Sequence, residues 1–179
     1  TLGLLSKMNW ILRIPSWQLF SLMIGGPIGL QYIGVLLDSP IAGVMVSASL
    51  WIFLTFGWIW SIGIASNHRL PVEFRRSTKL FTCGYLFAIL YMLCTFLFLL
   101  PMMGEDQHFP WIIVVPHLAA MFFIFYGMWF AARQFMTARR MEPVEAFEVF
   151  GPFFCLWFFP IGVWLIQPKV NELFSNETI

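Results

Sequence analysis

Long apolar runs separated by short polar segments dominate this sequence. Four runs contain no Asp, Glu, Lys or Arg, and they cover residues 16–37, 41–66, 80–103 and 111–132. A helix needs roughly 20 mostly apolar residues to cross the ~30 Å hydrocarbon core of a bilayer. The strands of a membrane barrel would alternate polar and apolar side chains, which none of these runs does. The pattern therefore predicts an all-α integral membrane protein with a bundle of four transmembrane helices.

The composition agrees with this prediction and excludes other classes. Charged residues make up 11% of the chain and hydrophobic residues 60%, against about 25% and 45–50% in soluble domains. So few charges cannot cover the surface of a soluble domain of 179 residues, and the apolar content is too high for a disordered chain. The net charge of +1 leaves no basic stripe for nucleic acid, so no nucleic-acid partner is expected.

The basic residues predict the orientation. Nine of the ten lysines and arginines lie on the side of the membrane that holds the N-terminus, the loop 67–79 and the segment after the fourth run. The other two loops contain Asp38, Glu105 and Asp106 and no Lys or Arg. The positive-inside rule makes the basic side cytoplasmic. The first run is too long for the apolar part of a signal peptide and is expected to be a permanent anchor.

The last quarter of the chain leaves two topologies open. Residues 133–150 mix charged and apolar side chains around Pro143, and we expect a cytoplasmic interfacial segment there. Residues 151–167 are strongly apolar but only 17 in number, which is about 26 Å as a helix. They either cross as a short fifth span or enter from the cytoplasm, turn near Pro160 and leave on the same side.

The spans offer few groups for chemistry. His117 is the only Asp, Glu, Lys, Arg or His in the four runs, which argues against an ion-coupled transporter and an intramembrane hydrolase. The three cysteines have no ligand-like spacing. His68 and His117 fall at opposite ends of their helices and cannot share a haem iron. No catalytic residue, metal site or cofactor is expected.

A polar layer in the outer third of the bundle is the first candidate site. Counting from the helix ends places four polar side chains at a similar depth, with His117 about 9 Å below the interface; they are Gln31, Ser47, Thr95 and His117. Such a layer is commonly explained by interhelical hydrogen bonds of about 0.6 kcal/mol each. A pocket for a lipid-like or quinone-like ligand is the functional alternative.

A basic loop between the second and third runs is the second candidate. Its positive side chains are Arg69, Arg75, Arg76 and Lys79. They either only set the topology or hold anionic headgroups or an acidic partner, with about 1 kcal/mol from each basic residue near an anionic surface.

Small residues predict where helices approach closely. The spacing of small side chains four residues apart marks a flat helix face. Such pairs are Gly25 with Gly29, Gly84 with Ala88, and Gly127 with Ala131. Pro27 is expected to kink the first helix.

Two stretches resemble a known group of proteins. GWIWSIG at residues 57–63, followed by Asn67 and Leu70-Pro71, is similar to a pattern in small polytopic bacterial inner-membrane proteins of uncharacterised function. Their C-terminal motif, of the type FFPIGxWxIQPxxN, resembles FFPIGVWLIQPKVN at residues 158–171. The resemblance implies a bacterial inner membrane and brings no activity with it.

These observations favour a protein without catalytic chemistry of its own. We expect an accessory or scaffolding subunit of a larger bacterial inner-membrane complex, with membrane lipids and other membrane subunits as partners. The alternative is a binding or transport protein for an apolar lipid-like or quinone-like ligand.

Overall fold

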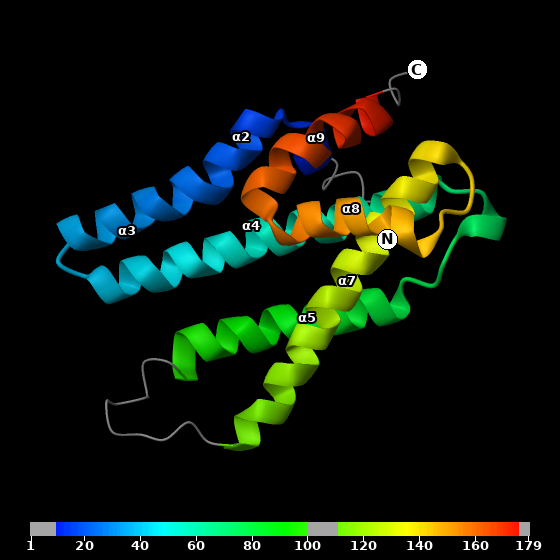
Figure 1. Ribbon diagram of the computed structural model, residues 1–179. Coiled ribbons are helices and arrows are strands. Elements are labelled where there is room, and N and C mark those ends of the chain that lie inside the picture. Colours follow the sequence, from blue (N-terminus) through cyan, green and yellow to red (C-terminus); the bar gives the residue numbers. More distant parts are fainter. Residues whose placement is uncertain (1–9, 100–110, 176–179) are drawn as a thin grey trace.

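Helices make up nearly all of the computed structural model, which describes residues 10–99 and 111–175 (Figure 1). Four helical stretches are long and apolar enough to cross a membrane, namely Ser16–Leu36, Pro40–Arg69, Lys79–Phe98 and Val114–Arg140. The predicted all-α bundle with four spans is confirmed. The second and fourth helices continue beyond the charge-free runs, to Arg69 and Arg140. Residues 100–103 of the third predicted run lie outside the described residues.

The first span is interrupted next to its proline. It consists of α2 (Ser16–Phe20), the π-helical turn η1 (Ser21–Gly25) and α3 (Gly26–Leu36). Pro27 has no N–H to donate to the preceding turn, and a π-turn is a common way for a helix to absorb such a break. The predicted irregularity is therefore a π-turn placed directly before the proline.

Glycines bring α3 close to α4 (Pro40–Arg69) at the turn between them. Asp38 adopts a left-handed backbone with φ of 55°. A Cβ atom on Gly34 would lie 2.5 Å from the Cα of Gly43, so the two backbones meet with no room for a side chain. The predicted pair Gly25 and Gly29 has no neighbour within 4 Å and takes no part in this contact.

The other predicted glycine contacts lie between the third and fourth spans. These spans contain α5 (Lys79–Cys94), continued by η3 (Thr95–Leu99), and α7 (Val114–Arg140), preceded by η4 (Trp111–Ile113). A Cβ on Gly84 would lie 2.2 Å from the Phe123 ring, and one on Gly127 would lie 2.3 Å from the Tyr85 ring. Because each glycine has no side chain, an aromatic ring of the facing helix packs directly against its backbone.

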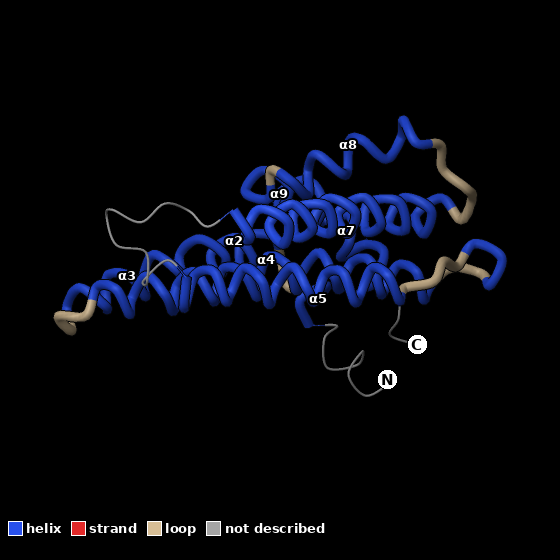
Figure 2. Tube along the Cα trace, turned by 90° about the horizontal axis from the view of Figure 1, so that it is seen from below, coloured by secondary structure: helices blue, strands red, loops and turns tan. Residues whose placement is uncertain are grey.

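Helix α7 is the centre of the bundle. It packs against α4, α5 and α8, and Figure 2 shows α8 on the side of α7 that faces away from α5. We call the end of the bundle at which α4 and α7 end and α5 begins the basic end. Its arginines and lysine are Arg69, Arg75, Arg76, Lys79, Arg133, Arg139 and Arg140.

The apolar C-terminal segment forms a bent helical hairpin. The helix axis bends by 120° between α8 (Ala146–Trp157) and α9 (Phe159–Ser175). The N–H groups of Ile161 and Gly162 both donate to the carbonyl of Phe158, at 3.0 and 2.9 Å. A Cβ on Gly162 would lie 1.6 Å from the carbonyl oxygen of Cys155. Only glycine allows α9 to leave the end of α8 in this direction.

Both ends of this hairpin lie at the basic end (Figure 1). Glu148 in the first turn of α8 pairs with Arg140 at the end of α7, and Arg69 at the end of α4 donates to the Leu173 carbonyl of α9. At the bend, the centre of the Trp157 ring lies 4.4 Å from the centre of the Phe125 ring, and Phe125 belongs to α7. A bent pair of this kind fits both predicted topologies, a broken fifth span and a re-entrant segment.

The predicted interfacial segment 133–150 contains the end of α7, a short connection and the start of α8. Residues up to Arg140 continue α7, and residues from Ala146 belong to α8, which continues through Pro152. The connection between them is fixed at both ends. Met141 ends α7 with a left-handed backbone (φ 57°), and the Glu148 carboxylate accepts the backbone N–H of Glu145, 3.2 Å away, to cap α8.

Candidate functional site

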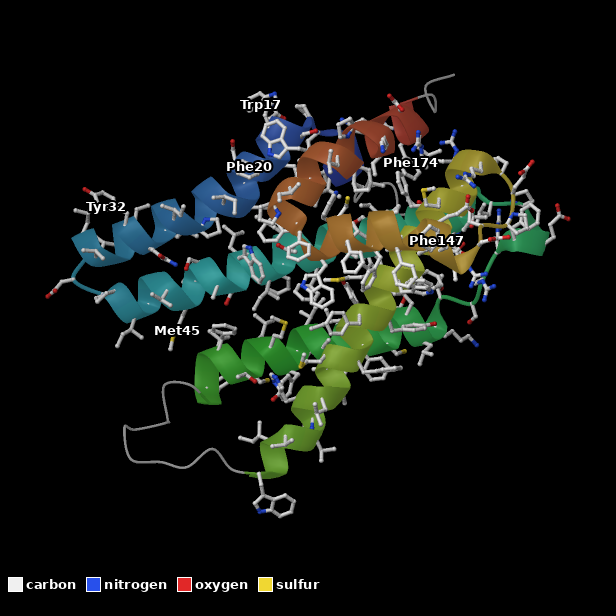
Figure 3. The ribbon with its side chains drawn as sticks, viewed as in Figure 1. Trp17, Phe20, Tyr32, Met45, Phe147 and Phe174 are labelled. Carbon is white, nitrogen blue, oxygen red and sulfur yellow. The ribbon has the colours of Figure 1, made fainter. Side chains whose placement is uncertain are left out.

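Two of the four predicted basic-loop residues are used within the fold. The guanidinium of Arg75 donates to the carbonyls of Leu70 and His68, at 2.7 and 2.9 Å, and so satisfies carbonyls at the end of α4. The Arg69 guanidinium donates to a carbonyl of α9 and lies 5.7 Å from the centre of the Phe174 ring. Figure 3 shows Phe174 at the end of α9, beside this contact. These two arginines hold the ends of helices.

Arg76 is held by its backbone instead. The Asn67 side chain donates to the Arg76 carbonyl at 3.1 Å and accepts the Arg76 N–H at 2.9 Å. This pair of bonds fixes the chain after the short 3-10 helix η2 (Val72–Phe74). The guanidinium of Arg76 has no hydrogen bond or ion pair within the described part of the chain. Lys79, the fourth predicted residue, begins α5 and is exposed.

A cavity of about 560 Å³ lies between this loop and the end of α7. Its walls include Glu73, Arg75, Arg76, Arg133, Gln134 and Thr137, and Pro143 and Val144 of the α7–α8 connection close one side. Arg76 and Arg133 are near enough for their positive charges to act on each other. The Glu73 carboxylate forms no ion pair with either arginine among the described residues. The cavity therefore has three arginines and one carboxylate in its wall, and Arg76 and Arg133 are the two arginines whose guanidinium groups make no hydrogen bond within the described residues.

Gln134 adds an uncharged donor to this cavity. Its side chain is only 2% exposed, it lines the cavity, and its amide makes no hydrogen bond to any residue that the structure describes. The neighbouring Thr137 hydroxyl is already used, because it donates to the Arg133 carbonyl at 2.9 Å. Gln134 is thus available to a bound group.

This arrangement is suited to an anion with several oxygen atoms. Guanidinium groups bind phosphate and carboxylate oxygens through charge-assisted, often bidentate hydrogen bonds. Sequence reasoning identified Arg76 and missed Arg133 and Gln134. Arg133 was counted only as a marker of orientation, and no pattern along the chain shows that it faces the loop.

In the predicted outer polar layer, Gln31 and Ser47 bond to each other, whereas His117 contacts Tyr91, a residue outside the predicted layer. The Gln31 amide of α3 donates to the Ser47 hydroxyl of α4 at 3.1 Å. On the other side, the Tyr91 hydroxyl of α5 lies 3.4 Å from Nδ1 of His117 in α7. Thr95 begins η3, and no hydrogen bond joins the two pairs within the described ranges. The structure places each pair as an interhelical contact.

A second polar group, which sequence reasoning did not identify, lies inside the bundle. The fully buried Gln167 accepts the indole N–H of Trp58 at 2.7 Å. Its amide lies 3.0 Å from the carbonyls of Ile11 and Ile14 and 2.9 Å from the Asn171 side chain. We call this network the Gln167 network. It joins α4, α9 and the segment before α2, and all its polar side-chain atoms have partners.

Comparison with known proteins adds no functional assignment. No protein-family model, curated protein or solved structure matches the chain. The resemblance to bacterial inner-membrane proteins of the FFPIGxWxIQPxxN type therefore stays a prediction. Two residues of that motif, Gln167 and Asn171, belong to the Gln167 network, and a third, Gly162, forms the bend of the hairpin.

Proposed function

We propose that this chain is a non-catalytic, multi-pass membrane protein that binds a ligand with an anionic group, such as phosphate, at its basic end. The observation that carries the proposal is the cavity of about 560 Å³ into which Arg76, Arg133 and Gln134 contribute side chains without protein partners among the described residues. Guanidinium and amide donors that no protein acceptor occupies can bind an anion without first breaking a bond of the fold. A bound anion would supply the missing acceptors.

This proposal keeps the predicted ligand-binding class and moves its site. The predicted pocket around His117 is replaced by a cavity at the opposite end of α7. By the positive-inside rule, the basic end faces the cytoplasm and so does the N-terminus. The resemblance of the C-terminal motif supports a bacterial inner membrane. An anionic cytoplasmic leaflet would raise the local concentration of phosphate-bearing ligands at this end.

Binding of two phosphate-bearing probes tests the proposal. Native mass spectrometry on protein purified in neutral detergent would measure binding of glycerol 3-phosphate and of dioleoyl phosphatidic acid. We expect Arg76→Gln and Arg133→Gln each to weaken the binding of at least one probe about tenfold, equivalent to about 1.4 kcal/mol.

The matched control is Arg139→Gln. Arg139 lies on the same helix end, 5.9 Å from the centre of the Phe135 ring, and does not line the cavity. Its replacement removes the same charge and should change binding less than twofold, because surface charges act weakly. If neither probe depends on Arg76 or Arg133 more than on Arg139, the proposal is wrong.

A second candidate function is that of an accessory subunit in a membrane complex. The observation that favours it is a row of exposed aromatic side chains on α8. Phe147 is 84% exposed (Figure 3), and the rings of Phe150 and Phe154 stack 6.2 Å apart next to it. Large exposed apolar surfaces face either lipid or a partner subunit. Mass spectrometry after gentle extraction tests this: proteins co-purifying in a fixed ratio support it, and a lone chain contradicts it.

A further inference from the structure

A second pocket, of about 460 Å³, adjoins the arginine cavity. We call it the aromatic pocket, and it is lined by Ser77, Leu80, Tyr126, Trp129 and Phe130 together with Arg76 and Arg133. The two arginines belong to both pockets. A polar space and an apolar space therefore meet at the same pair of positive charges.

The aromatic pocket extends from the arginines toward the middle of the bilayer. Tyr126 precedes Arg133 by two turns of α7, a distance of about 10 Å along the helix axis. This stretch of α7 lies in one of the four helices that are long and apolar enough to cross a membrane. The pocket thus descends from the charged rim to the depth at which acyl chains lie.

Neighbouring helices hold the wall of this pocket in place. Phe130 is 5% exposed and stacks on Phe81 of α5 with a centroid distance of 4.5 Å. Trp129 packs edge-on against Phe150 and Phe153 of α8, at 5.3 and 5.9 Å. Across the pocket Leu80 is 55% exposed. The wall is therefore preformed, while the Leu80 side is open to a ligand.

We propose that the anionic ligand is a membrane phospholipid, which rests on the proposed function of the arginine cavity. Its phosphate lies between Arg76 and Arg133, where Gln134 adds a further donor, and one acyl chain lies along the aromatic pocket. Guanidinium groups match phosphate geometry, and an apolar chain fits a wall of aromatic and leucine side chains. A free phosphate ester would use the arginine cavity and leave the aromatic pocket without an occupant.

Two probes with the same headgroup distinguish these sources. Dioleoyl phosphatidic acid carries the glycerol 3-phosphate group with two acyl chains, and glycerol 3-phosphate carries it alone. With native mass spectrometry in neutral detergent, we expect the lipid to bind at least tenfold more tightly than the soluble ester. A dihexanoyl phosphatidic acid should fall between them, which tests the acyl contact without any variant.

A blocked pocket and its control complete the experiment. Leu80→Trp fills the aromatic pocket and should weaken binding of the dioleoyl lipid about tenfold without changing that of glycerol 3-phosphate. Leu90→Trp makes the same change at a 53% exposed leucine of the same helix that does not line the pocket, and it should have no effect.

The outcomes separate the two proposals. If all three probes bind equally and depend equally on Arg76 and Arg133, the site takes a soluble anion, and the lipid inference is wrong while the proposed function stands. If Leu80→Trp changes lipid binding no more than Leu90→Trp does, the acyl chain does not use this pocket and the inference is again wrong. If no probe depends on the two arginines, both proposals fail.

Discussion

Two polar regions of this bundle differ in how their donors and acceptors are satisfied. In the Gln167 network, a fully buried amide has a partner for each of its polar atoms, drawn from Trp58, Asn171 and two main-chain carbonyls. In the arginine cavity, the side chains of Arg76, Arg133 and Gln134 have none among the described residues. The Gln167 network joins three parts of the chain, whereas the side-chain donors of the arginine cavity remain available for hydrogen bonds to a ligand.

Polar groups with protein partners are expected to contribute to stability, and polar groups without them are expected to contribute to binding. Polar groups buried in a low-dielectric interior stabilise a fold only when they are satisfied. In the arginine cavity Arg76 is exposed and Arg133 is half-buried, so water solvates these groups and they remain available to a ligand. Substitutions in the Gln167 network should therefore change stability, and substitutions in the arginine cavity should change binding.

The largest effect is expected where the hairpin that carries Gln167 bends. Gly162→Ala would put a Cβ atom 1.6 Å from the Cys155 carbonyl oxygen, so α9 must move and Gln167 moves with it. We expect the free energy of unfolding to fall by about 3 kcal/mol. Thermal or denaturant unfolding in detergent would measure this. Gly151→Ala is the control, because nothing lies within 4 Å of that site, and it should raise stability by a few tenths of a kcal/mol.

The next effect concerns the Gln167 network itself. Gln167→Leu removes the partners of the Trp58 indole and of the Ile11 carbonyl and one of the two donors to the Ile14 carbonyl, and we expect a loss of about 2 kcal/mol. Trp58→Phe removes only the indole donor and should lower stability by about 1 kcal/mol. Because the two residues share one bond, the double variant should lose less than the sum of both. Additive losses would show that Gln167 and Trp58 act independently.

The arginine cavity should respond in the opposite direction. Arg133→Gln removes one of two like charges and breaks no side-chain bond within the described residues. In the absence of ligand, we expect the free energy of unfolding to stay within about 0.5 kcal/mol of wild type or to rise. Binding of dioleoyl phosphatidic acid should weaken about tenfold in the same variant. A clear loss of stability without ligand would show that Arg133 holds the fold.

The smallest effect is expected in the outer polar layer. His117 is exposed, and its polar contact is with Tyr91 at 3.4 Å, too long for a strong hydrogen bond. His117→Leu should change the unfolding free energy by less than about 0.5 kcal/mol and leave lipid binding unchanged. A loss of ligand binding in this variant would return the site to the outer third of the bundle.

Sequence patterns predicted the parts of the molecule that depend on local composition. The four spans follow from the length of the apolar runs, and Arg76 was identified because it lies in a basic loop. The Gln31–Ser47 contact follows from counting depth along two adjacent helices.

The remaining features depend on distant approaches that no local pattern encodes. Arg133 and Gln134 face the loop because Asn67 fixes the loop backbone beside the end of α7. The Trp58–Gln167 bond joins residues 109 positions apart. The bend within residues 151–167 depends on the close approach of Gly162 to the Cys155 carbonyl, which the apolar pattern does not encode.

One set of unfolding curves tests the central claim most directly. The melting temperature would be measured for wild type, Gln167→Leu and the double variant Arg76→Gln with Arg133→Gln, each with and without dioleoyl phosphatidic acid. A ligand that binds the folded state raises the melting temperature. We predict that the lipid stabilises wild type and Gln167→Leu by similar amounts, and that the double variant starts at or above the wild-type temperature and gains nothing from lipid. A double variant that the lipid still stabilises as strongly as wild type would contradict the assignment of the arginine cavity as the binding site.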